Sequence, residues 1–299
     1  MPVLLLVVFA LILASSLLPQ ETLGLRDNPY LASVVIQLLI FAVPSLFWCR
    51  IRGREFTPRL RLNLFRPRQL LYLWHAAVFM TSLSVLLETV LYRLRPEGFV
   101  GSSLVEYASF AMNDRLFDGV YLVTAFAILP ALTEEFLFRG IVIGEYESLS
   151  PTVAVTVSAA LFAMSHFSWV RFPIYFTAGL VLGAVLYASR SVLAPILVHA
   201  LYNTAVLFGE KAALGIADKQ NVSSLLLIMI LAAAMLVSGL LMCFEAQNIY
   251  KDYAEANLPS DYGRTGERRG AFSHIAQAYF SPTFLLLVLV FITAATALR

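Results

Sequence analysis

The sequence has little charge for its length. Asp, Glu, Lys and Arg make up 13% of the 299 residues, whereas a soluble globular domain usually has about 25%. Hydrophobic residues make up 60% of the chain. Most side chains must therefore face lipid or other apolar helices. We predict an all-α fold, a polytopic membrane helical bundle, because helices satisfy every backbone polar group within lipid.

Cysteine is also scarce, and the net charge is small. The two cysteines each lie at the end of an apolar run, which argues against a disulfide framework, and two cysteines alone make no metal site. A formal net charge of +2 is too small to indicate nucleic-acid binding. We therefore expect no nucleic acid among the partners of the chain, and we expect the lipid bilayer to surround it.

Nine apolar segments are candidates for crossing the bilayer. A spanning helix needs roughly 20 apolar residues, within a range of about 17–25. The sequence therefore predicts eight or nine transmembrane helices in an integral, multi-pass protein, and the short loops favour a prokaryotic cell membrane. The segments are 2–19, 30–49, 70–93, 120–146, 152–169, 172–189, 192–209, 223–244 and 280–298.

Polar segments between these helices carry the information on orientation. Residues 50–68 hold seven arginines, and the positive-inside rule places such a loop in the cytoplasm. We interpret this run as a topology anchor. Residues 94–119 are then predicted to lie outside and residues 245–279 inside. The second of these segments mixes both signs of charge with Gly and Pro, so we expect a flexible polar loop.

Ionisable and strongly polar groups in the middle of the chain stand out, because charge inside a membrane is costly. Insertion scales put Asp, Lys or Arg at a helix centre at about 2.5–3.5 kcal/mol each. The fourth, fifth and seventh segments nevertheless contain such groups, which indicates a function. They are Glu134, Glu135 and Arg139, then His166, and then His199 and Asn203.

Helical spacing predicts how the groups of the fourth and fifth segments lie. Glu135 and Arg139 are four residues apart, so they share a helix face and can pair. Glu134 points in another direction and is left free by this pair. Glu134 and His166 each lie sixteen residues from a turn centred near residue 150. In an antiparallel hairpin both then lie about 24 Å along the helices from that turn.

The seventh segment is predicted to bring its polar groups to a similar depth. His199 and Asn203 are four residues apart and form one polar edge, roughly 13–20 Å along the helix from the turn that precedes them. Pro130 and Pro195 each lie four residues before a polar group of the site. Proline removes a helical hydrogen bond, so we expect both helices to kink or widen and to admit water.

The chemistry that these groups can perform is hydrolysis of a peptide bond, which needs an activated water and donors for the oxyanion. Glu134 suits the role of general base, and His166 can share the water. His199 and Asn203 can donate hydrogen bonds to the oxyanion. Alternatively, Glu134, His166 and His199 bind zinc with water at an open position. The zinc signature HExxH is absent, and so is the serine-hydrolase signature GxSxG.

Three motifs on successive membrane helices resemble those of a known family. EEFLFR at 134–139 matches EExxxR, FAMSH at 162–166 matches FxxxH, and HALYN at 199–203 matches HxxxN. In this order they resemble the CPBP family, which contains CAAX prenyl endopeptidases and bacteriocin-processing enzymes and is also called the Abi family. The resemblance implies that His199 and Asn203 stabilise the intermediate or complete a ligand set.

The resemblance also implies an activity and roles for the other motif residues. The activity is that of a glutamate-dependent intramembrane endopeptidase, sometimes described as a metalloprotease, that acts on a peptide or protein substrate. Carried over to this sequence, Glu134 is the base that activates water, and His166 holds the water or a divalent metal such as zinc. Arg139 orients the carboxylates, and Glu135 has a supporting role.

Two other functions are compatible with intramembrane polar groups. A proton-coupled transporter would favour repeated halves with broken helices at matching positions, and we find no such symmetry. A catalytically idle scaffold or immunity protein of the same fold should have lost a motif residue, and the motifs are intact. We therefore favour the enzyme and divide the chain into three parts. They are N-terminal membrane helices (1–119), a catalytic membrane core (120–209) and C-terminal membrane helices (210–299).

Overall fold

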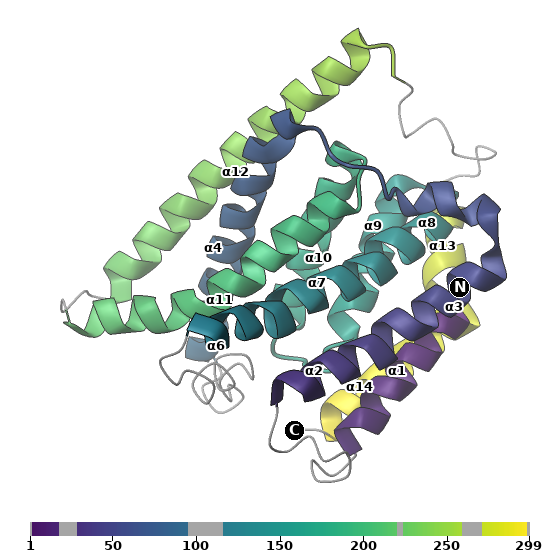
Figure 1. The fold of residues 1–299 in the computed structure, drawn as a ribbon, viewed down its shortest axis with the longest axis horizontal. Helices are drawn as coiled ribbons and strands as arrows, with labels where there is room; N and C mark the ends of the chain where they lie inside the picture. Colours follow the sequence, from purple (N-terminus) through teal and green to yellow (C-terminus); the bar gives the residue numbers. More distant parts are fainter. Residues whose placement is uncertain (1, 18–28, 95–115, 220–223, 259–270, 298–299) are drawn as a thin grey trace.

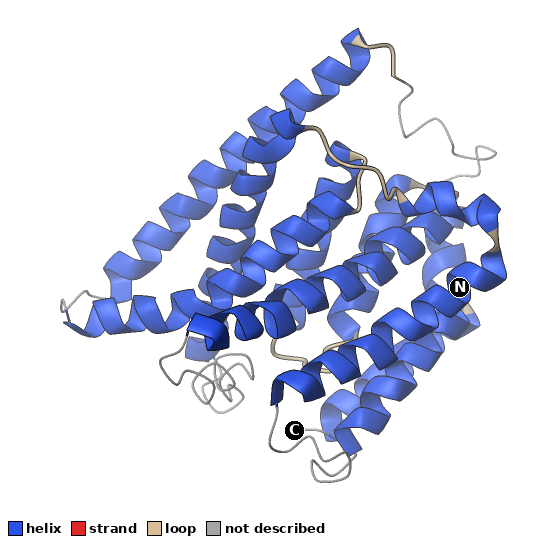
Figure 2. Ribbon diagram, in the orientation of Figure 1, coloured by secondary structure: helices blue, strands red, loops and turns tan. Residues whose placement is uncertain are grey.

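The fold is helical throughout the part of the chain that a computed structural model describes (Figure 1). This part covers residues 2–17, 29–94, 116–219, 224–258 and 271–297. Within these ranges every regular element is a helix and no strand occurs (Figure 2). The predicted fold class is therefore confirmed.

The helices pack as one bundle with several long members. In chain order the α-helices are α1 (Pro2–Leu17), α2 (Pro29–Gln37), α3 (Val43–Arg52), α4 (Leu70–Leu94), α6 (Leu116–Val123), α7 (Leu129–Glu135), α8 (Ile143–Tyr146), α9 (Pro151–Met164), α10 (Phe172–Ser189), α11 (Leu193–Lys219), α12 (Ser224–Glu255), α13 (Ala271–Tyr279) and α14 (Pro282–Ala297). Figure 1 shows α12 beside α4 at one side of the molecule, and α1, α3 and α14 together at the other. The elements that carry the predicted site lie between them, and they are α7, the π-helical segment that follows it, the end of α9, and α11.

Fewer helices reach a spanning length than we predict. Five described helices are long and apolar enough to cross a membrane, or six if the bent pair α13 and α14 counts as one span. The prediction of eight or nine is therefore more than the described residues support. The first, fifth and seventh predicted segments form shorter apolar helices instead. For example, α9 has 14 residues and covers about 21 Å, less than the roughly 30 Å of the hydrocarbon core.

Two spans contain π-helical segments, in which the helix widens. The segment η1 (Leu38–Ala42) joins α2 to α3, while η5 (Thr124–Ile128) and η6 (Phe136–Val142) lie on either side of α7. Pro130 lies in the first turn of α7, directly after η5. Because Pro130 has no N–H to continue the α-helical pattern, a wider turn before it is the expected response.

The two prolines therefore act differently. Pro130 lies beside a widened helix, as expected. The expectation for Pro195 is wrong, because this residue lies in the first turn of α11, which is an uninterrupted α-helix. N–H groups of a first turn have no partner within the helix, so a proline there removes no hydrogen bond.

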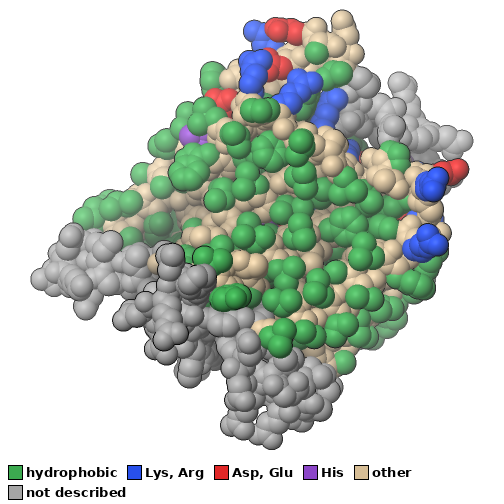
Figure 3. Space-filling view, viewed as in Figure 1, with side chains coloured by type: hydrophobic (Ala, Val, Ile, Leu, Met, Phe, Trp, Pro, Cys, Tyr) green, Lys and Arg blue, Asp and Glu red, His purple; other side chains and the backbone are tan. Residues whose placement is uncertain are grey.

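Charge gathers at one end of the molecule. Figure 3 shows charged side chains along the upper end and right edge of this face and apolar side chains over its middle. The basic loop 50–68 belongs to the charged end and includes two short 3₁₀ helices, η2 (Arg54–Leu60) and η3 (Pro67–Gln69). Arg52 donates two hydrogen bonds of 2.6 Å to Glu145, and Arg61 pairs with Glu147 at 2.9 Å. The loop thus binds to α8 through Glu145 and to the turn after α8 through Glu147.

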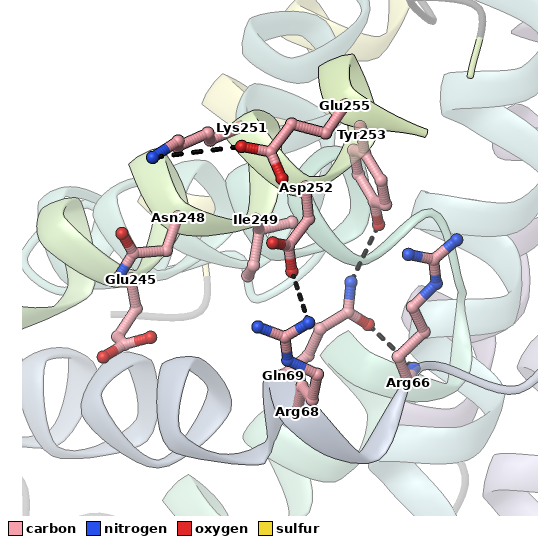
Figure 4. Close-up of a pocket in the computed structure, with 10 residues that line it drawn as sticks. All are labelled: Arg66, Arg68, Gln69, Glu245, Asn248, Ile249, Lys251, Asp252, Tyr253 and Glu255. Atoms are coloured by element: carbon pink, nitrogen blue, oxygen red, sulfur yellow. Dashed lines mark hydrogen bonds and ion pairs between the residues drawn. The ribbon is translucent and has the colours of Figure 1, made fainter. Parts of the chain in front are cut away.

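A cleft at this charged end lies between α12 and the η3 segment that precedes α4 (Figure 4). Gln69 donates to the Tyr253 hydroxyl at 2.8 Å, and that hydroxyl donates to the Ala188 carbonyl at 3.0 Å. Arg68 pairs with Asp252 at 3.2 Å. These contacts hold α12 against the bundle, and none of the residues that line the cleft is a predicted site residue.

The predicted polar loop 245–279 is helical at both of its ends. Of the predicted loop 245–279, residues up to Glu255 continue α12, and Ala271–Tyr279 form α13. The expectation of one flexible loop is therefore wrong for these residues. The helix α12 does not end where its apolar run ends but continues through the charged residues up to Glu255. Residues 259–270 and most of the external segment 94–119 lie outside the described residues.

Close packing of α9 against α10 positions the centre of the site. A Cβ atom at Gly179 would lie 2.8 Å from the Ala159 Cα atom, and one at Gly183 would lie 2.7 Å from a Val155 methyl group. Small residues four apart let two membrane helices approach closely. The GxxxG pair of α10 therefore sets the spacing of these two helices.

Candidate active site

A buried carboxylate, Glu135, joins two elements of the site. Oε1 of Glu135 lies 2.8 Å from Nη1 of Arg139 and 2.9 Å from Nδ1 of His199. The side chains of Glu135 and Arg139 are fully buried. The predicted pair four residues apart therefore forms, and the same oxygen also links α7 to α11.

Arg139 is held from three sides within the core. Besides Glu135, its Nη2 donates to the Gly179 carbonyl of α10 at 3.1 Å. Its guanidinium lies over the Phe162 ring, 4.7 Å from the centroid, so a cation–π contact adds to the ion pair. Arg139 thus connects η6, α9 and α10, and the approach of α10 permitted by Gly179 brings that carbonyl within reach.

Glu134 lies beside this pair and has a different partner. Its side chain is buried and Oε1 lies 3.5 Å from Nε2 of Gln37, at the end of α2. Oε1 of Gln37 in turn accepts from the Thr133 hydroxyl at 3.1 Å. Arg139 pairs with Glu135, as predicted, so Glu134 is left for other contacts.

His166 lies in the turn that follows α9. Its Nδ1 lies 2.9 Å from the Phe162 carbonyl, and its ring stacks on Tyr175 with the centroids 3.7 Å apart and the planes at 20°. A carbonyl oxygen only accepts, so Nδ1 carries the hydrogen and Nε2 has the free lone pair. The rings of His166 and His199 both contact the Phe162 ring.

Asn203 lies one turn beyond His199 on α11 and is buried. Its amide nitrogen lies 3.5 Å from the Ala127 carbonyl in η5. His199 and Asn203 thus contact two successive parts of the fourth span, as the prediction of one polar edge requires. Because α11 and the fourth span run in opposite directions, Asn203, which follows His199 on α11, lies beside Ala127, which precedes Glu135 on the span.

Phe162 lies at the centre of these contacts. Its ring makes edge contacts with the rings of Phe138, His166 and His199, with centroids 5.3, 5.0 and 5.8 Å apart. The first residue of the second motif therefore contacts residues of all three motifs, namely Arg139, His166 and His199.

Comparisons with known proteins agree with this arrangement. Residues 116–205 match the family described as Type II CAAX prenyl endopeptidase Rce1-like. The chain is 23% identical over 182 residues to the membrane-embedded CAAX protease MroQ of Staphylococcus aureus (strain USA300), a match that covers 58% of this chain and 72% of that protein. Both matches support the resemblance of this chain to the CPBP family. No solved structure matches it significantly.

The family and the relative that the chain matches are both described as CAAX endopeptidases or proteases, and the relative is membrane-embedded. The matched segment contains all three motifs, which the structure places on η6 and α7, at the end of α9, and on α11. Together with the five or six helices of spanning length, the match establishes an integral, multi-pass membrane protein.

The metal that the CPBP resemblance implies has to be tested against the residues present. Among the described residues, no group of three or more His, Cys, Asp or Glu side chains is placed to hold a metal ion. The proposed set Glu134, His166 and His199 therefore does not form such a group. The residues as placed do not fit a metal, so we derive no step through one.

Sequence reasoning missed three residues beside the motif groups. Gln37 contacts Glu134 and Thr133, and Tyr175 stacks on His166. Gln37 carries a signal, because it is a strongly polar residue inside the apolar run 30–49. Thr133 and Tyr175 are ordinary residues of membrane helices, and nothing in their spacing distinguishes them.

Proposed function

We propose that this protein is an intramembrane endopeptidase in which Glu134 activates a water molecule to hydrolyse a peptide bond. The observation that carries the proposal is the 2.9 Å contact between Glu135 and His199, which joins the first and third motifs in one buried cluster. A purely structural ion pair needs no second helix with an imidazole and an amide at matching depth. The family match supports the same class of reaction.

The first step is attack of water on the scissile carbonyl carbon. Glu134 takes one proton from the water while the oxygen forms a bond to the carbonyl carbon, and the carbonyl π electrons move onto its oxygen. Nε2 of His166, the nitrogen with the free lone pair, accepts a hydrogen bond from the same water. Collapse of the tetrahedral intermediate then breaks the C–N bond, and the proton held by Glu134 passes to the leaving amine.

We infer that the third motif, through His199 and Asn203, stabilises the oxyanion. Nδ1 of His199 donates to Glu135, so Nε2 is the nitrogen available to the substrate. When His199 is protonated, Nε2 donates to the oxyanion, and the negative charge of Glu135 stabilises the imidazolium. Asn203 has a second amide hydrogen besides the one that points to Ala127, and it supplies the second donor.

The substrate class that we propose follows from the names of the relatives. One is described as a CAAX prenyl endopeptidase and the other as a membrane-embedded CAAX protease. We therefore propose a peptide or protein substrate that is anchored in the membrane near its cleavage site. A lipid-anchored substrate reaches a buried site by diffusing within the bilayer.

The test is cleavage of a defined peptide by the purified protein in liposomes. The probe is an internally quenched peptide with a farnesylated Cys-aliphatic-aliphatic-X terminus, with the unprenylated peptide beside it, and mass spectrometry identifies the products. We expect the wild type to cleave at least the farnesylated peptide, and Glu134→Ala to be inactive. The control Glu55→Ala changes an exposed glutamate and should cleave like the wild type. Cleavage by Glu134→Ala at the wild-type rate would refute the mechanism.

A further inference from the structure

Gln37 is a polar side chain in a span that is otherwise apolar from residue 34 to Trp48 apart from Ser45. It is the last residue of α2, far from the three motifs in sequence and outside the segment that matches the family. Burying an amide without partners in an apolar environment is costly. The partners that Gln37 finds are both on α7: Glu134 at 3.5 Å and Thr133 at 3.1 Å.

The carboxylate of Glu134 determines which end of the Gln37 amide faces it, because a carboxylate only accepts. The Thr133 hydroxyl lies 3.1 Å from Oε1 of Gln37, and it also lies 3.0 Å from the Leu129 carbonyl and 3.3 Å from the Pro130 carbonyl. The amide nitrogen of Gln37 then points to Oε1 of Glu134 as a donor. In this orientation the Gln37 amide oxygen is the end that faces the Thr133 hydroxyl.

The local helix geometry is a second, separate observation that points to Gln37 and Glu134. Among the described residues, the π-helical segments are η1, η5 and η6. The first begins directly after Gln37, and η5 and η6 enclose the helix α7 that carries Glu134. Segments of this kind are rare and are frequent at functional sites. The widening after Gln37 therefore marks α2 as part of the site rather than as a lipid-facing helix alone.

We propose that Gln37 is a positioning residue, which acts through Glu134 by holding its carboxylate in one orientation, and that Thr133 fixes the Gln37 amide for this task. The inference rests on the proposed function of Glu134. A carboxylate on a helix rotates about its side-chain bonds, and a general base needs one orientation toward the water. Glu135 has the ion pair with Arg139 for this purpose, and Gln37 supplies the corresponding restraint for Glu134.

The test measures kcat and KM for the farnesylated reporter peptide in liposomes. Gln37→Leu removes both hydrogen bonds at nearly equal volume, Thr133→Val removes only the hydroxyl, and Ile36→Ala is the control on the same helix, at an exposed position. We expect kcat to fall by about tenfold or more in Gln37→Leu, since a general base contributes about 10²–10⁴ to the rate. KM and the thermal midpoint should stay near those of Ile36→Ala, and Thr133→Val should show a smaller loss of kcat.

A second measurement separates positioning from a merely structural role. In a Glu134→Asp background the carboxylate is withdrawn from Gln37, so Gln37→Leu should cost at most twofold there. An equal loss in both backgrounds would overturn the inference, and so would a wild-type kcat in Gln37→Leu. If Gln37→Leu fails to fold, a wild-type kcat in Thr133→Val overturns it. If instead the wild type does not cleave, or Glu134→Ala cleaves normally, the proposed function itself has failed.

Discussion

His199 of α11 donates its hydrogen bond to Glu135 and not to Glu134, across 2.9 Å. The two adjacent glutamates are thereby divided between two tasks. Glu135 receives both an arginine and an imidazole through one oxygen. Glu134 receives one amide, at 3.5 Å from its Oε1, so Oε2 is the oxygen that can meet water. The division explains how one helix turn can hold a structural carboxylate and a reactive one.

The ion pair of Glu135 with Arg139 should be essential to stability. We expect Glu135→Gln to lower the free energy of unfolding by about 3–5 kcal/mol, because it leaves a buried guanidinium uncompensated. The double variant Glu135→Gln/Arg139→Met should recover much of this loss but remain inactive. Thermal unfolding in detergent, followed by the peptide assay, measures both effects. Equal stability of Glu135→Gln and the wild type would show that the pair is dispensable.

His199 should be needed for the rate and much less for the fold. We expect His199→Ala to lower kcat by about 10²–10³, the usual cost of losing one oxyanion donor. The imidazole is buried at the edge of the Glu135 pair, and Arg139 remains to compensate that carboxylate. Kinetics on protein that elutes normally from size exclusion provide the measurement. A kcat within twofold of the wild type would remove His199 from the mechanism.

Gly179 should tolerate no side chain. A Cβ atom there meets the backbone of Ala159 at 2.8 Å, so Gly179→Ala must push α10 away from α9 and from Arg139. We expect a loss of about 1–3 kcal/mol in stability, the usual cost of overpacking. Gly119→Ala is a matched control, because its Cβ atom meets nothing within 4 Å. If both variants unfold at the same temperature, the close approach of these helices is not required.

Removal of metal should leave the enzyme active. The described acidic and imidazole side chains offer no set of three ligands, so we expect activity to survive dialysis against a strong chelator. Elemental analysis of the purified protein should find less than one zinc per chain. Loss of activity on chelation with recovery on zinc addition would contradict this expectation and restore the zinc hypothesis for Glu134, His166 and His199.

Much of the site could be predicted because helix periodicity is regular over short distances. The pairing of Glu135 with Arg139 needs only the four-residue spacing, and the structure confirms it. The turn near residue 150 is also confirmed, since α8 ends at Tyr146 and Ser150 caps the start of α9. That cap and the proline after it are local signals, which the sequence shows directly.

Other features depend on contacts that spacing does not encode. Glu135 could be paired with Arg139, but which glutamate His199 would meet depends on the rotation of α11 against α7. Gln37 meets Glu134 across 97 positions of sequence, and no motif links the two. The predicted number of spans is larger than the described helices support, because apolar length alone does not distinguish a crossing helix from a shorter one such as α9.

The most direct test of the account is the cleavage rate of Glu134→Gln at saturating farnesylated reporter peptide in liposomes. This substitution keeps the shape of the side chain and removes its ability to take a proton from water. We expect a kcat about 10²–10⁴ below that of the wild type, with an unchanged thermal midpoint. A kcat within twofold of the wild type would contradict the assignment of Glu134 as the base.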